Sequence, residues 1–571
     1  MSTPTIPPAS AEAKPVVPVK ESKAQKSERL KREKNPWEAL EEIRTFAREG
    51  RSSVLPEWAE FYFKWWGIYT QGDGLGVTGG TGGTGKATEF FMLRAGIPSG
   101  HATSEQIRAI GQFARDHARN LADITTRQAI QLHWLTIQDV PAAIEALYKV
   151  GLSPKGACGD VVRNVTGCPL AGLDAHEIID ASPLAKAIAR EVNGNSEFYN
   201  LPRKFKITVT GCPVWCSYPE IDDIALTGAK RLLPGGEEEI GFSVHVGGGL
   251  SNEPHMAVKL DCFIREDQGV QVVHAITEIF REQQGLRQSR DKARLKYLFM
   301  NEGWLPSRFL AELQAKLPFQ LAPGVPDPTP DDVFRDHAGI RPQKQSGLYS
   351  VGATVLNGRM TGEQLVAIAD IADELASGEI RTTVTQNFVI PNVPKANLDS
   401  VLHRLSQLGL TVEATNFWRG AVACTGTEFC KLAITETKGF ARWLVQEMEG
   451  RLPGFDQQLT IHVTGCPNSC GQHWIADIGL EGKKIKHEGK LVDAWQFALG
   501  GALGQHRAFA RTLTYRARSE EVPNALERLL GNYLATRGTD ENLRAWFASR
   551  TNDDLKGILE SGVSSEVLVT T

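Results

Sequence analysis

Two tight pairs of cysteines stand in the second half of the sequence. Cys424 and Cys430 belong to ACTGTEFCKL, and Cys466 and Cys470 belong to VTGCPNSCGQ. Four thiolates can hold a cubane iron–sulfur cluster, in which each iron takes one cysteine sulfur. The glycine, threonine and proline residues around them let the backbone turn closely, so that its N–H groups can approach the sulfurs. A zinc ion with four cysteine ligands is the alternative that this spacing leaves open.

The composition is that of an ordinary multidomain globular protein. The chain has 571 residues, too many for one core, with 41% hydrophobic residues and a net charge of −4. This slight acidity argues against a nucleic-acid-binding protein. No apolar run reaches the length of a transmembrane helix, so we expect no membrane span. Nine cysteines grouped in motifs favour reduced thiols and a cytoplasmic location.

The N-terminal segment, residues 1–34, is rich in Pro, Ala, Lys and Glu and poor in large apolar residues. It therefore predicts a disordered tail, and it lacks the apolar stretch of a secretory signal. Ordered structure is expected to begin at Asn35, which can cap a helix that has Pro36 at its first position.

A glycine-rich stretch at residues 72–85 contains two partial nucleotide-binding motifs. Ala87 follows the lysine of GTGGTGK, where a P-loop needs Ser or Thr to hold magnesium. No hydrophobic strand precedes either glycine run, so a phosphate-binding strand–loop–helix unit is not predicted. We interpret the stretch as a surface loop.

The chain repeats itself with a period of about 255 residues. GHATSEQI from Gly100 matches GRMTGEQL from Gly358, and VTGCPVWC ending at Cys216 matches VTGCPNSC ending at Cys470. Between such motifs, short apolar strands alternate with helical segments, as at 90–97, 104–118, 130–137 and 140–152, which predicts mixed α/β layers. Two like units are expected to pair about a pseudo-twofold axis with a shared site between them. We call residues 35–325 the first copy and residues 326–571 the second copy.

The two copies differ in their chemical residues. The second copy has all four cysteines, whereas the first has Cys168, Cys212 and Cys216, with about Asp174 in the place of Cys430. Three cysteines make a poor cubane site, so the first copy is interpreted as a degenerate cluster site. It instead has cations that the second lacks, because Arg94, Lys204 and Lys206 correspond to Gly352, Gln458 and Thr460, while Arg163 corresponds to Arg419.

These cations predict an anion-binding pocket. Lys204 and Lys206 alternate around Phe205 in RKFKITVTG, so both point to one face of a strand, and Arg94 follows the apolar FFML run. Solvated surface charges are the plain alternative. Cations at the ends of buried strands beside a glycine-rich turn favour anion binding. One copy would then hold a redox cluster and the other an anion.

These motifs resemble the siroheme-dependent assimilatory nitrite and sulfite reductases over residues of about 38 to 555. The resemblance rests on the four cysteines and on FMLR, TTRQAIQLHW, VVRNVTGCPLAG and NLPRKFK. It implies an α+β fold with a pseudo-twofold internal repeat, in which two ferredoxin-like half-domains and two α/β modules surround one siroheme and one 4Fe-4S cluster. The expected domains are a disordered tail (1–34), the first ferredoxin-like half-domain with an N-terminal extension (35–150), the first α/β module with the substrate cations (151–325), the second ferredoxin-like half-domain (326–412) and the second α/β module with the cluster cysteines (413–571).

The resemblance also implies roles for particular residues. The ligands of the cluster would be Cys424, Cys430, Cys466 and Cys470, with Cys470 bridging to the siroheme iron. The residues that bind the substrate oxyanion would be Arg94, Arg163, Lys204 and Lys206. The groups that hold the siroheme would be Arg127, Gln128, Gln131, His133 and Asn468. Some family members have a tyrosine–cysteine cross-link beside the siroheme, and Tyr69 and Cys158 stand in similar places.

The substrate expected from the resemblance is nitrite, reduced to ammonium in a six-electron reaction, with sulfite reduction to sulfide as the alternative. CPNSCGQ and GCPLAGLDAHEIID resemble nitrite reductases, whereas Lys204-Phe-Lys206 resembles sulfite reductases. A non-catalytic siroheme or cluster sensor is a remote third possibility, because it would be expected to lose the cations. No nicotinamide or flavin motif is visible, so ferredoxin is the expected electron donor to a monomeric enzyme. It could dock on the basic residues of 287–296 or on Lys483, Lys484 and Lys486, although solvated charge runs are common.

Overall fold

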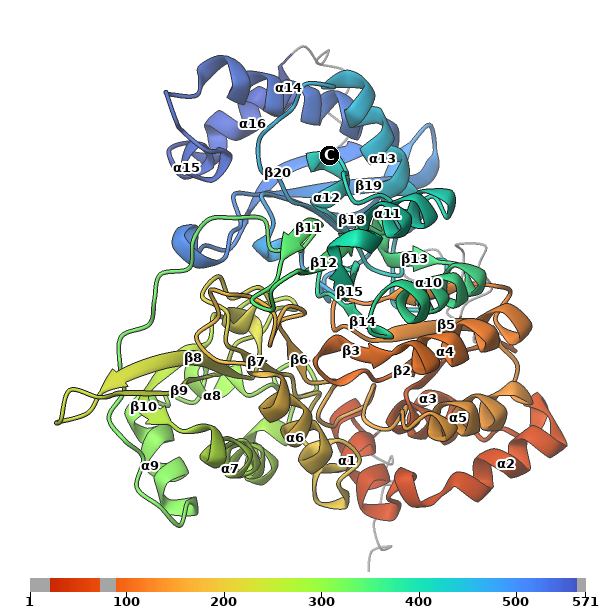
Figure 1. Cartoon of the computed structure of the whole chain (residues 1–571). Coiled ribbons are helices and arrows are strands. Elements are labelled where there is room, and N and C mark those ends of the chain that lie inside the picture. Colours follow the sequence, from red (N-terminus) through yellow and green to blue (C-terminus); the bar gives the residue numbers. More distant parts are fainter. Residues whose placement is uncertain (1–20, 72–88, 562–571) are drawn as a thin grey trace, which may run out of the picture.

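The computed structural model describes residues 21–71 and 89–561 (Figure 1). The predicted loop at 72–85 and the first part of the predicted tail, residues 1–20, lie outside this described part. No helix of the described ranges is long and apolar enough to cross a membrane.

Two antiparallel sheets form the ferredoxin-like half-domains. Their strands are β1 (Ile68–Thr70), β2 (Phe91–Ala95), β3 (His101–Thr103), β4 (Ala122–Ile124), β5 (Ile130–Leu135), β11 (Gly339–Pro342), β12 (Leu348–Ala353), β13 (Arg359–Met360), β14 (Glu379–Thr382) and β15 (Phe388–Pro394). One sheet has the order β1-β2-β5-β4-β13 and the other the order β11-β12-β15-β14-β3. Each copy therefore gives a short strand to the sheet of the other copy.

Because these short strands are exchanged, each of the two sheets contains residues of both copies. Strand β13 pairs with β4, where Arg359 is opposite Asp123, and β3 pairs with β14, where Thr103 is opposite Glu379. The helices that come next in each copy, α4 (Ser104–His117) and α10 (Gly362–Leu375), cross closely at two glycines. A Cβ added to Gly111 would lie 2.7 Å from the carbonyl oxygen of Gly362. This reciprocal arrangement confirms the predicted pseudo-twofold repeat.

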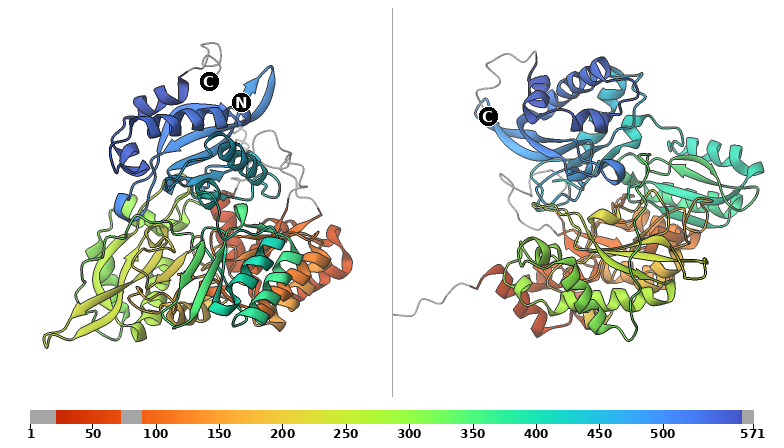
Figure 2. Two further views of the ribbon diagram at one scale, coloured as in Figure 1. Left: turned by 45° about the horizontal axis from the view of Figure 1, so that its top comes forward. Right: turned by 90° about the vertical axis from the view of Figure 1, so that its left-hand side faces the viewer.

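The two α/β modules have the same topology as each other. Their strands are β6 (Thr166–Gly167), β7 (Ile207–Thr210), β8 (Ile224–Leu232), β9 (Glu238–Val246) and β10 (Val258–Ile264) in the first copy, and β16 (Ala421–Ala423), β17 (Ile461–Thr464), β18 (Ile478–His487), β19 (Lys490–Leu499) and β20 (Arg511–Arg518) in the second. In each module the first three strands run parallel to one another. The fourth strand is antiparallel to the third, and the fifth is antiparallel to the fourth. Figure 2 shows from two further sides that the second module (blue) lies above the remainder of the molecule.

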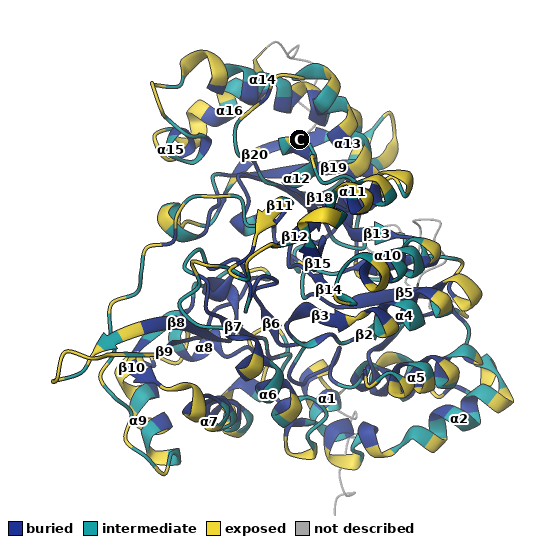
Figure 3. Ribbon diagram, in the orientation of Figure 1, coloured by how far each residue is buried: buried dark blue, intermediate teal, exposed yellow. Residues whose placement is uncertain are grey.

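Helices join and cover these sheets. Helix α6 (Ser182–Val192) connects β6 to β7, and α13 (Lys438–Arg451) connects β16 to β17. The predicted helix from Ser104 is confirmed as α4, and that near 140–152 as α5 (Asp139–Lys149). The other α-helices are α2 (Leu40–Glu49), α3 (Pro56–Glu60), α7 (Gly269–Glu282), α8 (Lys296–Met300), α9 (Pro306–Lys316), α11 (Leu398–Gln407), α12 (Asn416–Arg419), α14 (Val522–Thr536), α15 (Leu543–Ala548) and α16 (Asn552–Glu560). Figure 3 shows that the strands are mostly buried and that exposed residues gather on the outer faces of the helices.

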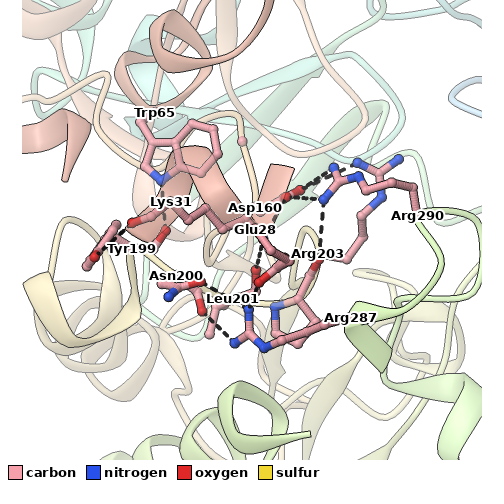
Figure 4. Close-up of polar contacts among 12 residues, drawn as sticks. Glu28, Lys31, Trp65, Asp160, Tyr199, Asn200, Leu201, Arg203, Arg287 and Arg290 are labelled. Atoms are coloured by element: carbon pink, nitrogen blue, oxygen red, sulfur yellow. Dashed lines mark hydrogen bonds and ion pairs between the residues drawn. The ribbon is translucent and has the colours of Figure 1, made fainter. Parts of the chain in front are cut away.

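The N-terminal segment contradicts part of the predicted tail. Residues Lys23–Glu33 form helix α1, which begins with a capping box between Ser22 and Gln25. Lys31 is fully buried, and its Nζ donates to the carbonyl oxygen of Leu201 at 2.7 Å and lies 3.1 Å from Asp160 (Figure 4). The prediction of disorder is wrong for residues 21–34, because ion pairs with the first copy and the burial of Leu30 hold this helix in place. At Asn35, the side chain caps the 3-10 helix Pro36–Glu38, as expected.

Candidate active site

The cysteines of the second copy gather at the carboxyl ends of two parallel strands. Cys424 directly follows β16, and Cys466 stands two residues after the end of β17. Since β16 and β17 are parallel neighbours, both cysteines lie at the same edge of the sheet. Cys430 follows Cys424 in its loop, and its N–H donates to the carbonyl oxygen of Gly426. Cys470 ends the loop after β17 and is exposed, unlike Cys466.

Backbone and side-chain donors point at these sulfurs. The N–H of Gly465 donates to Cys424 Sγ at 3.2 Å, and Asn468 Nδ2 donates to Cys466 Sγ at 3.5 Å. Burial raises the pKa of the Cys430 thiol to about 11, and backbone N–H groups of residues 432 and 433 act against that rise. Buried thiols with donors of this kind suit the thiolates of an iron–sulfur cluster, whose charge the donors stabilise.

The spacing of the sulfurs distinguishes a cluster from a single zinc ion. Zinc holds each sulfur at about 2.3 Å, so tetrahedral thiolates lie about 3.8 Å apart. Among the described residues, no three of these four cysteines bring their sulfurs within 4.8 Å of one another. A cubane separates its ligands more widely, because each sulfur binds a different iron. The four cysteines are therefore not drawn together as around one zinc ion, which favours the 4Fe-4S cluster over the zinc alternative.

The cations of the first copy lie in a half-buried group. Arg94 is in β2, and its Nη1 donates to the carbonyl oxygen of Ala157 at 3.0 Å. Arg163 Nη1 reaches the same oxygen at 3.3 Å and donates twice to the carbonyl oxygen of Gly159. Both guanidinium groups are thus fixed by the same loop, and the Nε atom of Arg94 is buried without a hydrogen-bond partner.

Two lysines complete this cationic group. In the described part of the chain, no hydrogen bond or ion pair involves the Nζ atoms of Lys204 and Lys206. Burial lowers the pKa of Lys206 to about 8, with Asp222 acting against it, and burial lowers the pKa of Lys204 well below its ordinary value. Amines with such pKa values can bind an anion and also release a proton near neutral pH.

The cations and the cluster cysteines face each other across the two copies. Cys470 and Cys430 help to raise the pKa of Arg94, and Cys470 opposes the lowering of the pKa of Lys204. These thiols therefore lie within electrostatic reach of the cations. Thr126 Oγ1 also donates to the carbonyl oxygen of Cys470 at 3.5 Å. The structure thus brings together the two groups that the sequence separates by about 255 residues.

Tyr69 and Cys158 lie beside the same cations. Arg94 Nη1 donates to Cys158 Sγ at 3.1 Å. Burial raises the pKa of Tyr69, and the adjacent Cys158 raises it further by charge and by hydrogen bonding. The two side chains that the resemblance singled out are therefore in contact at the anion pocket.

The residues expected to hold a siroheme differ in how far they are buried. Gln128 and His133 are completely buried. Gln128 bonds to backbone groups at its amide nitrogen and oxygen, and His133 pairs with Asp123 at 3.0 Å and stacks on Phe429. Internal contacts use both side chains in this structure, and their expected contact with the siroheme stays a prediction.

Arg127, Gln131 and Asn468 remain predicted siroheme contacts. Arg127 forms an ion pair with Asp222 at 2.6 Å, while its Nε atom is buried without a partner. Gln131 Nε2 is 3.4 Å from Met92 Sδ. The orphaned Nε atoms of Arg94 and Arg127, together with the exposed thiol of Cys470, fit a prosthetic group that has carboxylates and an iron able to accept a thiolate.

One pair of aspartates that supports the site was missed. Asp223 accepts the N–H of Lys206 at 2.8 Å and two hydrogen bonds from Arg294. Asp477 in the second copy accepts the N–H of Thr460 at 2.8 Å and a bond from Arg544. The repeat DIALTG/DIGLEG contained this signal, because a matched acid before each third strand indicates a shared structural task.

The second copy has a cavity in the place of the cations. It has a volume of about 50 Å³, and its lining includes Arg419, Gln458 and Thr460. These residues correspond to Arg163, Lys204 and Lys206. The cavity thus marks the pseudo-symmetric counterpart of the anion pocket. Its two positions matching Lys204 and Lys206 have no charge, while its cations are Arg419 together with Arg335 and Arg544.

The basic segment 287–296 is not the docking surface that the sequence suggested. Arg287 pairs with Glu28 at 2.7 Å and Arg290 with Asp160 at 2.9 Å (Figure 4). Arg294 pairs with Asp223 at 2.7 Å. Lys296 is completely buried, and Lys292 is exposed. The prediction is wrong because these charges form internal ion pairs, and the alternative of a solvated face fails for the same reason. In the other patch Lys486 is exposed, while Lys483 and Lys484 are partly exposed and paired with acids.

Comparison with known proteins gives consistent matches. A family model described as the nitrite and sulphite reductase 4Fe-4S domain matches residues 158–321 and 414–555. A second, the nitrite/sulfite reductase ferredoxin-like half domain, matches residues 84–150 and 341–408. The sequence is 35% identical to the assimilatory ferredoxin-dependent nitrite reductase of Haloferax mediterranei over 90% of this chain and 89% of that protein. It is also 35% identical to a sulfite reductase (ferredoxin) of Mycobacterium tuberculosis over 93% of this chain and 96% of that one.

A solved structure matches the fold as a whole. The structure of the NirA protein of Mycobacterium tuberculosis superposes with a TM-score of 0.87, at 35% identity, and covers 93% of this chain and 97% of that chain. The similarity therefore extends over both copies and includes the α/β modules as well as the half-domains.

Proposed function

Because the chain belongs to the family of nitrite and sulfite reductases, we propose that it reduces nitrite to ammonium in the cytoplasm as a monomer, with ferredoxin as the electron donor. The family carries a siroheme and a 4Fe-4S cluster. The observation that carries the proposal is the placement of Arg94 and Lys204 within electrostatic reach of Cys470.

The cofactors would be held by residues from both copies. Cys424, Cys430, Cys466 and Cys470 would provide the four thiolates of the cluster, and Arg127, Gln131 and Asn468 would contact the siroheme. When bound, these cofactors supply the iron that takes the substrate anion and the electrons that reduce it.

The four cations of the first copy would bind the substrate anion and supply protons. Arg94 and Arg163 are held by backbone carbonyl oxygens, so they offer fixed donors where negative charge develops on the substrate oxygens. Lys204 and Lys206 have free ammonium groups, which bind the anion and then donate protons as its oxygens leave as water. Reduction of nitrite to ammonium consumes eight protons and six electrons and releases two waters, so a supply of protons is needed. Buried lysines with lowered pKa values meet that need.

Sulfite reduction is the second candidate, and Lys206 is the residue that favours it. An additional cation binds a dianion more strongly than a monoanion, since the Coulomb energy scales with the charge. Relatives with both names have 35% identity to this chain, so their names favour neither substrate. The motifs CPNSCGQ and GCPLAGLDAHEIID support nitrite.

Steady-state kinetics on both anions tests the proposal. We expect a higher kcat/KM for nitrite than for sulfite, with reduced ferredoxin as the donor. Lys206→Asn should lower kcat/KM for sulfite more than for nitrite, because the dianion loses about twice the interaction. A wild-type enzyme that is more efficient on sulfite would reject nitrite as the substrate.

The donor site is proposed at the patch formed by Lys483, Lys484 and Lys486. Replacing Lys486 by Glu should weaken the binding of ferredoxin and reduce its salt dependence, because exposed charges steer acidic partners. Lys292→Glu is the matched control, since Lys292 is an exposed lysine of the other segment. Unchanged ferredoxin kinetics in the Lys486 variant would exclude this patch.

A further inference from the structure

The three cysteines of the first copy converge more tightly than the four cysteines of the second. Cys168, Cys212 and Cys216 bring their sulfurs within 4.8 Å of one another, and the sulfurs of Cys212 and Cys216 are 3.4 Å apart. Among the described residues this is the one group of three or more possible metal ligands that converges so closely. All three side chains are at least 97% buried.

This spacing matches a single metal ion and not a cluster. Thiolates bound at about 2.3 Å to one tetrahedral ion lie about 3.8 Å apart, which is close to the observed separations. The carboxylate in the place of the fourth cysteine does not join the group, because Asp174 Oδ1 instead accepts the N–H of His176 at 2.9 Å. The first copy has therefore lost the cubane geometry and retained a smaller, three-sulfur pocket.

The pocket is already arranged to stabilise thiolates. The N–H of Leu170 points to Cys168 Sγ at 3.4 Å, and the N–H of Cys216 points to Cys212 Sγ at 3.5 Å. Thr210 Oγ1 is 3.6 Å from Cys212 Sγ. Thiols that served only as small apolar side chains in the core would not need these hydrogen-bond donors.

We propose that Cys168, Cys212 and Cys216 bind one thiophilic divalent metal ion, of the zinc class, at a structural site separate from the cluster. Sulfur-rich sites select such ions over magnesium or calcium, and a buried site with protein ligands is typical of structural zinc.

His337 is the candidate for the fourth ligand. Its side chain is 92% buried, and its Nε2 atom has no hydrogen-bond partner. His337 lies outside the group of sulfurs within 4.8 Å, so its side chain would turn toward them to complete the site. Three cysteines and one histidine form an established kind of zinc site.

The position of the site suggests what the ion would stabilise. Cys168 directly follows β6, while Cys212 and Cys216 belong to the turn after β7. The same loop is held by Arg381, which donates to the carbonyl oxygens of Pro169 and Ala171 at 3.0 and 2.7 Å, and it packs on Val389 of β15. The ion would thus brace the first α/β module against the second ferredoxin-like half-domain.

Metal analysis of the purified holoenzyme tests the site. Wild type should contain about one zinc ion per chain in addition to its iron, and Cys216→Ser should lose the zinc while its iron content stays at the wild-type level. Cys262→Ser is the matched control, because Cys262 is a buried cysteine in β10 outside both sites. His337→Ala should bind zinc more weakly in a competition with a chromophoric chelator, and unchanged affinity would overturn its assignment as a ligand.

A measurement on the wild-type protein covers the case in which the cysteine variants do not fold. Titration with an organomercurial should release the metal from the native protein as three thiols react. A wild type that holds no metal besides its prosthetic-group iron would overturn the proposal. So would a Cys212–Cys216 disulfide found by peptide mass spectrometry without reduction, or zinc retained in Cys216→Ser. A thiol-bound ion lost from Cys216→Ser would support it whether that ion is zinc or an additional iron.

Discussion

The two α/β modules share a strand order and differ in the loops that leave their parallel strands. In the second copy, the loops after β16 and β17 carry four cysteines spaced for a cluster. In the first, the loops after β6 and β7 carry three cysteines spaced for one ion, and the segment before β7 carries Lys204 and Lys206. The framework that both copies keep includes the matched aspartates Asp223 and Asp477.

This difference shows how one duplicated unit can divide two tasks. A substrate anion needs cations and protons, whereas electron delivery needs thiolates that hold a cluster. Separating the two sets into different copies, and then exchanging strands β3 and β13, lets the sets face each other without sharing a loop.

The largest effect on activity is expected for Cys470, the cluster cysteine nearest to the cations of the first copy in the proposed site. Cys470→Ser should lower nitrite-reducing activity by at least about 100-fold, because a cluster ligand is lost and even outer-sphere changes cost 10- to 100-fold. Iron content and the absorption and electron paramagnetic resonance spectra of the purified variant would measure the change. Cys216→Ser, its counterpart in the first copy, should leave the iron and the spectra unaltered; equal losses in both variants would contradict the division of tasks.

The next effect concerns the cations that only the first copy has. Lys204→Ala should reduce kcat/KM by about 100- to 1000-fold, as the removal of one preorganised donor to a developing anion does. Gln458→Ala is the matched change in the second copy, and it should alter kcat/KM by less than about twofold. Near-equal effects would show that the cavity around Gln458 also takes part in turnover. Thermal melting of both variants would exclude misfolding.

A smaller effect is expected from pH. Burial lowers the pKa of Lys206 to about 8, so its protonated form is lost as the pH rises through 8. Because the protonated lysine is the form that binds and donates, kcat/KM should decline above about pH 8 by up to tenfold per pH unit. Lys206→Arg keeps its charge and should move this decline to higher pH. A profile that declines at the same pH in both enzymes would assign the titration to another group.

Sequence reasoning predicted the repeat and the cluster because both depend on local spacing. The pairs around Cys424 and Cys466 and the matched DIALTG and DIGLEG segments are visible without any contact map. The exchange of β3 and β13 could not be predicted, since strands of two or three residues carry no pairing information. The burial of Gln128 and His133 likewise depends on tertiary packing, which the motif TTRQAIQLHW does not encode. A motif shows which residues are near a site, and packing decides which of them face it.

The structure of the charged segments was the hardest part to predict from the sequence. Residues 21–34 and 287–296 have compositions typical of a disordered tail and a solvated face. They pair with each other and with Asp160 instead, and the pKa of that carboxyl is held well below its usual range by Lys31 and Arg290 despite burial. Patterns of hydrophobicity cannot reveal such a cluster, because each partner becomes buried only when all of them meet.

The smallest effect tests this N-terminal clamp, which joins α1 to the first copy. Lys31→Met should lower stability by about 1–3 kcal/mol. Removing one partner of a buried pair usually costs about 3–5 kcal/mol, but Asp160 retains Arg290 and Arg203. The midpoint of the first thermal unfolding transition should fall by a few degrees, and cleavage after residue 33 in limited proteolysis should become faster.

Lys26→Ala on the same helix is the control, since Lys26 pairs with Glu60 at 3.1 Å while 43% of its side chain is exposed. An exposed pair contributes about 0–1 kcal/mol, so this variant should melt close to wild type. If both variants melted alike, the helix would be held by its apolar contacts, such as that of buried Leu30. If Lys31→Met alone unfolded early and kept its kcat, the ion-pair cluster would stabilise the first copy without shaping its anion pocket.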